Sequence, residues 1–184
     1  EINSTSESLA PAMLDLLQNK KFGPHQIPSG WILVSAGNPA EYNRSAREFD
    51  MVTLDRLKKI DVNTDFDAWK RYAYRKLFSE DVLSFLAHRQ QYLFHAEKTP
   101  QGLLFVTPRG WEDLSQALII YHELDIEISY ELIIQYVQFD KIAREFQRYY
   151  YLYRKYKNNY DVAAILDGNY KKDIEKFKSA KFDE

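Results

Sequence analysis

The chain has 184 residues and a net charge of −2, and 45% of its residues are hydrophobic and 28% charged. This balance allows a packed core, excludes global disorder, and gives no general signal for binding nucleic acid or a membrane. The absence of cysteine excludes disulfides and thiolate metal sites and fits a cytoplasmic protein, and no apolar run reaches the roughly 18–20 residues that span a bilayer.

The first third of the chain predicts alternating helices and strands. We expect a helix over residues 5–20 and a strand over 31–36, where a short apolar run is cut off by Gly37-Asn38-Pro39. An apolar run bounded by turn residues is typical of a buried parallel strand. A short helix is expected over 44–58 and a second strand over 59–62. Helix, strand, helix, strand is the order of a parallel α/β half-sheet.

The pattern changes after Val62, where Asn63-Thr64-Asp65 forms a helix-start cluster and predicts a domain boundary. The rest is expected to be mainly helical, with a possible small hairpin over 92–106 around Thr99-Pro-Gln-Gly102. The predicted helices cover residues 66–77, 79–90, a segment beginning at Pro108, 130–138 and 140–159. The predicted parts are a half-sheet over 1–62, a helical domain over 63–160 and a charged tail over 161–184.

Several kinds of site find no support in the sequence. The four histidines have neither a second histidine nor a cysteine at metal-ligand spacing, so no metal site is predicted. No Gly-x-Ser-x-Gly elbow is present, and no Gly-x-x-x-x-Gly-Lys-Ser/Thr is present to cradle a triphosphate. Tyrosines and basic residues interleave over 149–157, which is compatible with nucleic-acid binding. We favour instead a helix that packs its tyrosines and turns its basic residues to water.

Four short motifs carry a family resemblance. They are Glu1-Ile2-Asn3, the run Ser35-Ala-Gly-Asn-Pro-Ala-Glu-Tyr-Asn43, Leu54-Asp55-Arg56, and Pro108-Arg109 at a helix start. With them the chain resembles the C-terminal part of a MoxR-type AAA+ ATPase. The resemblance begins at the second acid of the Walker B motif, covers the rear of the αβα core over 1–62, and continues through the helical lid.

The resemblance implies roles for two residues of the half-sheet. Glu1 matches the second Walker B acid, which polarises the attacking water. The alternative for Glu1 is a solvated glutamate. Asn38 matches sensor 1, whose amide both donates and accepts and so holds the lytic water and touches the γ-phosphate. The alternative for Asn38 is a simple turn after a strand.

Two arginines complete the implied site. Arg56 is the arginine-finger candidate, which neutralises charge on the transferring phosphoryl group across a subunit interface, with Arg47 and then Arg44 as alternatives. Arg56 is equally compatible with an Asp–Arg ion pair within one subunit. Arg109 matches sensor 2 at the start of a lid helix, where an early side chain faces an anion. The alternative for Arg109 is a surface arginine near a helix cap.

The resemblance implies that the intact protein binds Mg-ATP and hydrolyses it in a homo-oligomeric ring, expected to be a hexamer. The work done would be chaperone-like remodelling of a client protein or metal insertion into a partner protein. The chain alone has no P-loop, so we expect it to be inactive and to need no cofactor. The alternative hypothesis is a non-catalytic helical module for protein interaction, joined to a vestigial half-sheet.

Overall fold

The computed structural model describes residues 2–43, 45–100 and 102–157. Glu1, Arg44 and the expected charged tail lie outside these residues. Over the described residues the protein is mixed α/β and mostly helical. The chain divides into two compact units, Glu1–Val62 and Asn63–Glu184, and the division falls where the sequence pattern changes.

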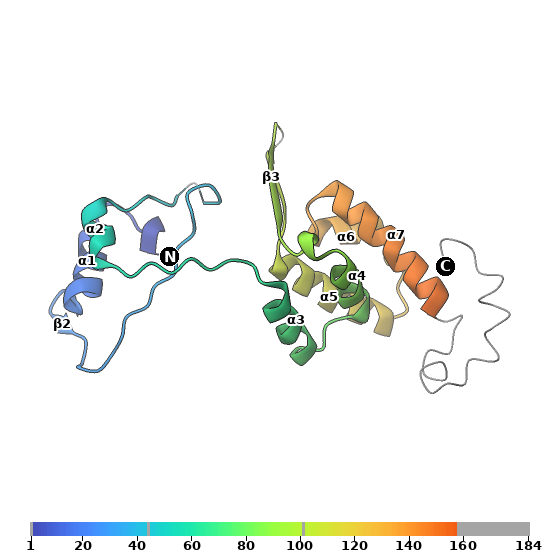
Figure 1. The fold of residues 1–184 in the computed structure, drawn as a ribbon, viewed down its shortest axis with the longest axis horizontal. Helices are drawn as coiled ribbons and strands as arrows, with labels where there is room; N and C mark the ends of the chain where they lie inside the picture. The colour runs from blue at the N-terminus through green and yellow to red at the C-terminus, as the bar shows by residue number, and fades with distance from the viewer. Residues whose placement is uncertain (1, 44, 101, 158–184) are drawn as a thin grey trace. The chain divides into compact units, whose positions relative to one another are not determined.

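The first unit contains little regular structure (Figure 1). Its α1 begins at Ala10, later than expected, with a proline in the first turn, and ends where Lys20 takes the left-handed conformation. Its α2 is shorter than expected and is capped by Asp50, whose carboxylate accepts from the Thr53 N–H at 2.7 Å. The elements are η1 (Ile2–Ser4), α1 (Ala10–Asn19), β1 (Lys21–Phe22), β2 (His25–Gln26) and α2 (Met51–Arg56).

The predicted half-sheet is wrong for the described residues of this unit. Residues 31–36 and 59–62 form no strand, and the only sheet here is the short antiparallel pair of β1 and β2. Ile32 and Val34 are 84% and 90% exposed, and Val62 is 92% exposed. A strand needs a neighbouring strand for its backbone hydrogen bonds, and no described segment of this unit supplies one. The apolar pattern is therefore present without the burial it predicts.

The second unit is a helical bundle with one hairpin (Figure 1). Asp65, Thr107 and Ser129 each cap a helix, because the side-chain oxygen accepts the N–H three residues later. The elements are α3 (Phe66–Arg75), α4 (Glu80–His88), η2 (Gln90–Tyr92), β3 (His95–Thr99), β4 (Gly102–Val106), α5 (Pro108–Glu123), α6 (Tyr130–Tyr136) and α7 (Asp140–Lys157).

The β3–β4 hairpin projects from the bundle and lies within the range where the sequence suggests one (Figure 1). Its register pairs His95 with Val106 and Thr99 with Gly102. Only the base is buried: Val106 is inaccessible, whereas Leu103 and Leu104 are more than a third exposed. The hairpin is tied to the bundle at that end, since the Phe105 N–H donates to the Gln138 carbonyl at 3.3 Å.

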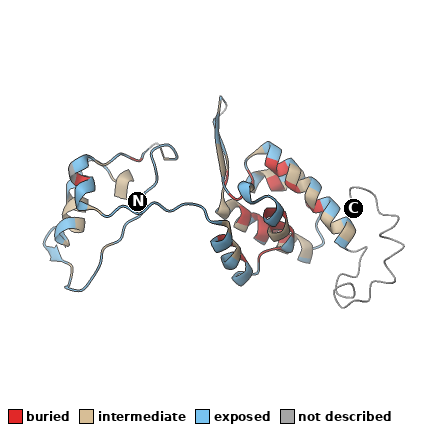
Figure 2. Ribbon diagram, viewed as in Figure 1, coloured by how far each residue is buried: buried red, intermediate tan, exposed pale blue. Residues whose placement is uncertain are grey.

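The buried residues of the second unit form one core (Figure 2), and the aromatic centre of this core lies between α4, α5 and α7. Phe85 is 1% exposed, and its ring lies 5.7 Å from that of Trp111 and 5.2 Å from that of Phe146. The buried indole of Trp111 donates from Nε1 to the Tyr92 carbonyl at 2.8 Å, which satisfies its polar atom. The apolar faces of these three helices thus meet in one set of packed rings.

Gly110 allows close approach of α6 to the first turn of α5. A Cβ at this position would lie 2.5 Å from the Tyr136 carbonyl oxygen, which is closer than side-chain carbons come to backbone. The glycine costs helix propensity, yet no other residue fits without moving α6. The first turn of α5, which carries Arg109, is therefore fixed by backbone contact.

Candidate functional site

The four sequence-predicted residues fall in different places. Glu1 lies outside the described residues. Asn38 is exposed in the irregular segment of the first unit, and Arg56 is the exposed last residue of α2. Arg109 is exposed in the first turn of α5, in the second unit. Asn38 and Arg56 thus share a unit, and Arg109 belongs to the other.

The start of the chain is hydrogen-bonded to the segment that carries Asn38. The Ile2 N–H donates to the Ala36 carbonyl at 3.2 Å, and Asn3 Nδ2 donates to the Asn38 carbonyl at 2.6 Å. The contact brings together Asn3 and Asn38, which are 35 residues apart in sequence.

The same short segment is bonded on its other side to residues that follow Asn38. The Arg47 N–H donates to the Asn3 carbonyl at 2.8 Å, and Asn43 Nδ2 donates to Ser4 Oγ at 2.9 Å. The Arg47 side chain is engaged within the unit, since its Nη1 lies 3.1 Å from a Glu7 carboxylate oxygen. Both partners are at least half exposed, so this pair adds little stability.

The side chains of the other two candidate arginines, Arg56 and Arg109, are both exposed. No ion pair joins Asp55 to Arg56 among the described residues, so the local alternative for Arg56 gains no support. At the start of α5, Thr107 Oγ1 accepts from the Gly110 N–H at 3.1 Å. This hydrogen bond satisfies one of the free N–H groups of the first turn. The Arg109 side chain, in the same turn, is exposed to solvent.

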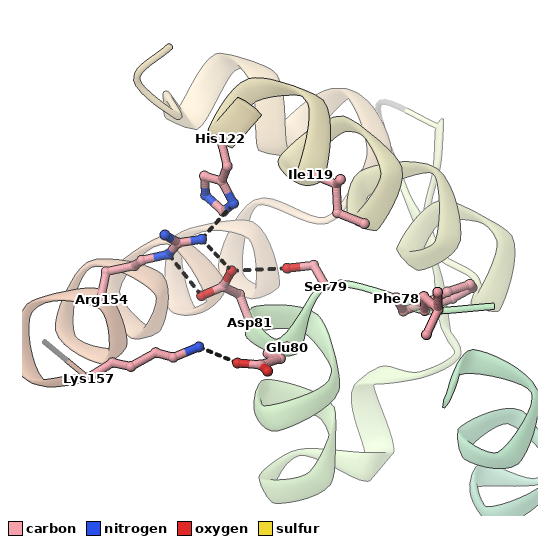
Figure 3. A pocket seen from close by; sticks show the side chains of 9 residues that line it. Phe78, Ser79, Glu80, Asp81, Ile119, His122, Arg154 and Lys157 are labelled. Atoms are coloured by element: carbon pink, nitrogen blue, oxygen red, sulfur yellow. Dashed lines mark hydrogen bonds and ion pairs between the residues drawn. The ribbon is translucent and has the colours of Figure 1, made fainter. Parts of the chain in front are cut away.

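A second polar cluster, which the sequence did not predict, lines a shallow pocket of about 310 Å³ between α4, α5 and α7 (Figure 3). The Asp81 side chain is only 4% exposed. It accepts from Arg154 through Nε at 3.3 Å and Nη2 at 3.2 Å, and from Ser79 Oγ at 3.0 Å. The buried carboxylate is therefore paired and hydrogen-bonded, as burial of a charge requires.

The cluster continues through His122 at the end of α5 (Figure 3). Arg154 Nη2 lies 2.5 Å from His122 Nδ1, and His122 Nε2 lies 2.8 Å from the Tyr150 hydroxyl. Because a guanidinium only donates, Nδ1 must accept and the imidazole is neutral, with its hydrogen on Nε2. Burial lowers the pKa of His122, and the positive charge of Arg154 lowers this pKa further.

The pocket offers no net charge to a ligand. Arg154 is paired with Asp81, and Lys157 is paired with Glu80. The cluster instead connects three helices, since Asp81 lies on α4, His122 on α5 and Arg154 on α7. Asp81 and Arg154 are 73 residues apart, so no short motif reveals the pair.

Comparisons with protein-family models, with curated proteins and with solved structures find no match to this chain. Within the described ranges, no group of three or more His, Cys, Asp or Glu residues is placed to hold a metal ion. Nor does any helix of those ranges combine the length and the apolar character needed to cross a membrane.

Proposed function

We propose that this chain is the C-terminal part of a MoxR-type AAA+ ATPase. The protein that joins it to a P-loop would hydrolyse Mg-ATP in a hexameric ring and use the energy for chaperone-like remodelling or metal insertion into a partner. The isolated chain, which contains no Gly-x-x-x-x-Gly-Lys-Ser/Thr, is expected to turn over no ATP.

One observation supports this proposal beyond the motifs themselves. The second Walker B acid and sensor 1 act on the same water molecule, so the segments that carry them must lie together. The residues after Glu1 do lie against the segment of Asn38, through the bonds from Ile2 to Ala36 and from Asn3 to Asn38.

The proposed site residues fit their roles by exposure and type. Asn38, Arg56 and Arg109 are all exposed, so each side chain is accessible to a nucleotide or to a neighbouring subunit. A primary amide suits water positioning, and a guanidinium suits contact with phosphate oxygens. Magnesium would be held by the P-loop and by the first Walker B acid, neither of which this chain supplies.

The test is phosphate release by the full gene product, with whatever sequence precedes Glu1. Asn38→Ala should lower kcat by about 10²–10³-fold, because a group that orients the reacting water is lost. Arg109→Ala should also lower kcat, because the proposed phosphate contact is lost. Arg148→Ala, an exposed arginine of α7, is its control and should leave kcat unchanged. Full activity of Asn38→Ala would refute the assignment.

Mixing subunits tests the arginine finger. Arg56→Ala and Asn38→Ala rings should each have strongly reduced activity, whereas mixed rings should regain part of it. In a mixed ring, an intact Arg56 from one subunit can meet an intact Asn38 of its neighbour. If mixing restores no activity, Arg56 acts within its own subunit or not at all, and Arg47 becomes the arginine-finger candidate.

The non-catalytic interaction module is the second candidate. Its support is the second unit, which has a complete core of its own and a projecting hairpin with Leu103 and Leu104 partly exposed. A full gene product that binds no nucleotide would favour this candidate over the ATPase.

A further inference from the structure

Asn3 is bonded on both sides. Its side-chain Nδ2 donates to the Asn38 carbonyl at 2.6 Å, and its own carbonyl accepts the Arg47 N–H at 2.8 Å. One short residue therefore connects the segment before Pro39 to the segment that follows it. A donor group on Asn3 is essential to this arrangement, because the atom it meets on Asn38 is a carbonyl oxygen.

Gly37 gives Asn3 the space to reach Asn38. A Cβ on residue 37 would lie 2.5 Å from Asn3 Oδ1 and 3.0 Å from Asn3 Cγ. The glycines with a left-handed φ are Gly23, Gly30 and Gly102, so backbone conformation does not explain a glycine at 37. The close approach of the Asn3 amide explains it.

We infer that Asn3 is a positioning residue that fixes the backbone of Asn38 and thereby places the Asn38 amide against the attacking water. This inference rests on the proposed ATPase function for its catalytic consequence. The hydrogen bond itself stands apart from that function. Misplacing a water-orienting group by about 1 Å costs up to roughly 10²-fold in rate, so a single bond here affects turnover.

Asn3→Asp is the sharpest variant, because it keeps the shape of the side chain and removes the donor. The carboxylate would meet the Asn38 carbonyl with like partial charge. In the 184-residue chain, amide hydrogen exchange at Ile2 and Arg47, whose N–H groups donate to the Ala36 and Asn3 carbonyls, should become at least about 10-fold faster in Asn3→Asp and in Asn3→Ala. Asn19→Asp is the matched control, since Asn19 is an exposed asparagine of the same unit that bonds Asp15.

The full gene product supplies the second readout. Asn3→Asp should lower kcat by about 10–100-fold and leave KM for ATP within about twofold, since Asn3 itself touches no nucleotide. Gly37→Ala should show the same pattern. Adding Asn3→Ala to Gly37→Ala should cost little more, because both changes remove the same contact.

The two proposals fail in different ways. A wild-type gene product without ATPase activity refutes the proposed function and leaves the exchange result to judge the Asn3–Asn38 bond. An active wild type whose Asn3→Asp variant matches it in both exchange and kcat overturns the positioning role. Equal damage from Asn3→Asp and Asn19→Asp would also overturn it, since the effect would then be a general cost of an added charge.

Discussion

The two units of this chain are held together by different means. In the described part of the first unit only Ala46 and Thr53 are buried, and the segments are joined mainly by hydrogen bonds between loops. The second unit buries a continuous cluster of aromatic and aliphatic side chains around Phe85 and Trp111. Figure 2 shows this contrast as the difference between exposed and buried colours.

This difference indicates which unit has a core large enough to fold by itself. Burial of apolar area is the dominant favourable contribution to folding, whereas each hydrogen bond contributes only about 0.5–1.5 kcal/mol after exchange with water. The second unit therefore has its own source of stability. The first unit exposes Ile32, Val34 and Val62, which are strand-forming residues with no strand beside them.

The largest effect should come from the core of the second unit. Phe85→Ala should lower the free energy of unfolding of this unit by about 3–5 kcal/mol, because a fully buried ring is replaced by a cavity. Urea unfolding followed by tryptophan fluorescence measures the loss, with Trp31 of the first unit replaced by phenylalanine so that only Trp69 and Trp111 of the second unit report. Ile120→Ala on α5, at a side chain 53% exposed, is the control and should change it by less than about 0.5 kcal/mol. A loss below about 1 kcal/mol for Phe85→Ala would contradict the comparison.

A smaller effect should follow from pH. The pKa of His122 is lowered in the folded protein by burial and by Arg154 and Lys157, while Asp81 opposes the shift. The unfolded chain therefore takes up the proton more readily, and the second unit should lose stability as pH falls below about 6.5. Above about 6.5 this contribution is fully present.

Urea unfolding at about pH 7.5 and about pH 5.5 measures the pH effect. His122→Gln, which cannot take up the proton, should reduce the difference between the two conditions. An unchanged difference in this variant would show that another group carries the pH dependence.

The smallest effect should come from the apolar residues of the first unit. Ile32→Ala and Val34→Ala should each change the stability of the isolated chain by less than about 0.5 kcal/mol, since both side chains are more than four-fifths exposed. Amide exchange of the first unit is the measurement. Val106→Ala, at an inaccessible position of the second unit, is the comparison and should cost about 2 kcal/mol, measured by amide exchange of the second unit. A comparable loss from Val34→Ala would mean that this apolar run is covered.

The helices were predictable because their signals are local. Pro108 and the Thr107 cap set the start of α5, and helical spacing of apolar residues indicated α3 through α7. The predicted strands over 31–36 and 59–62 failed because a strand depends on a distant partner that local pattern does not report. The apolar run of residues 31–34 has the composition of a buried strand, yet only pairing makes it one.

The sequence indicates a candidate site residue only where a short local motif carries it. Asn38, Arg56 and Arg109 follow from motifs, and their roles stay predictions. Asn3 belongs to one of these motifs, but its contact with Asn38 spans 35 residues and has no local signal. The Asp81–Arg154 pair was missed altogether, because a buried aspartate on an apolar helix face has no signature until its partner is placed.

The separation of Asp81 and Arg154 by 73 residues in sequence also determines how late during synthesis the second unit can fold. A ribosome adding about 5–20 residues per second needs roughly 4–15 s to pass from one to the other. For most of that interval the nascent chain has the Phe85 ring without Phe146, and until its end it has the Asp81 carboxylate without the Arg154 guanidinium. The second unit cannot close until α7 has left the exit tunnel, so α7 decides when the growing chain stops exposing its aromatic residues.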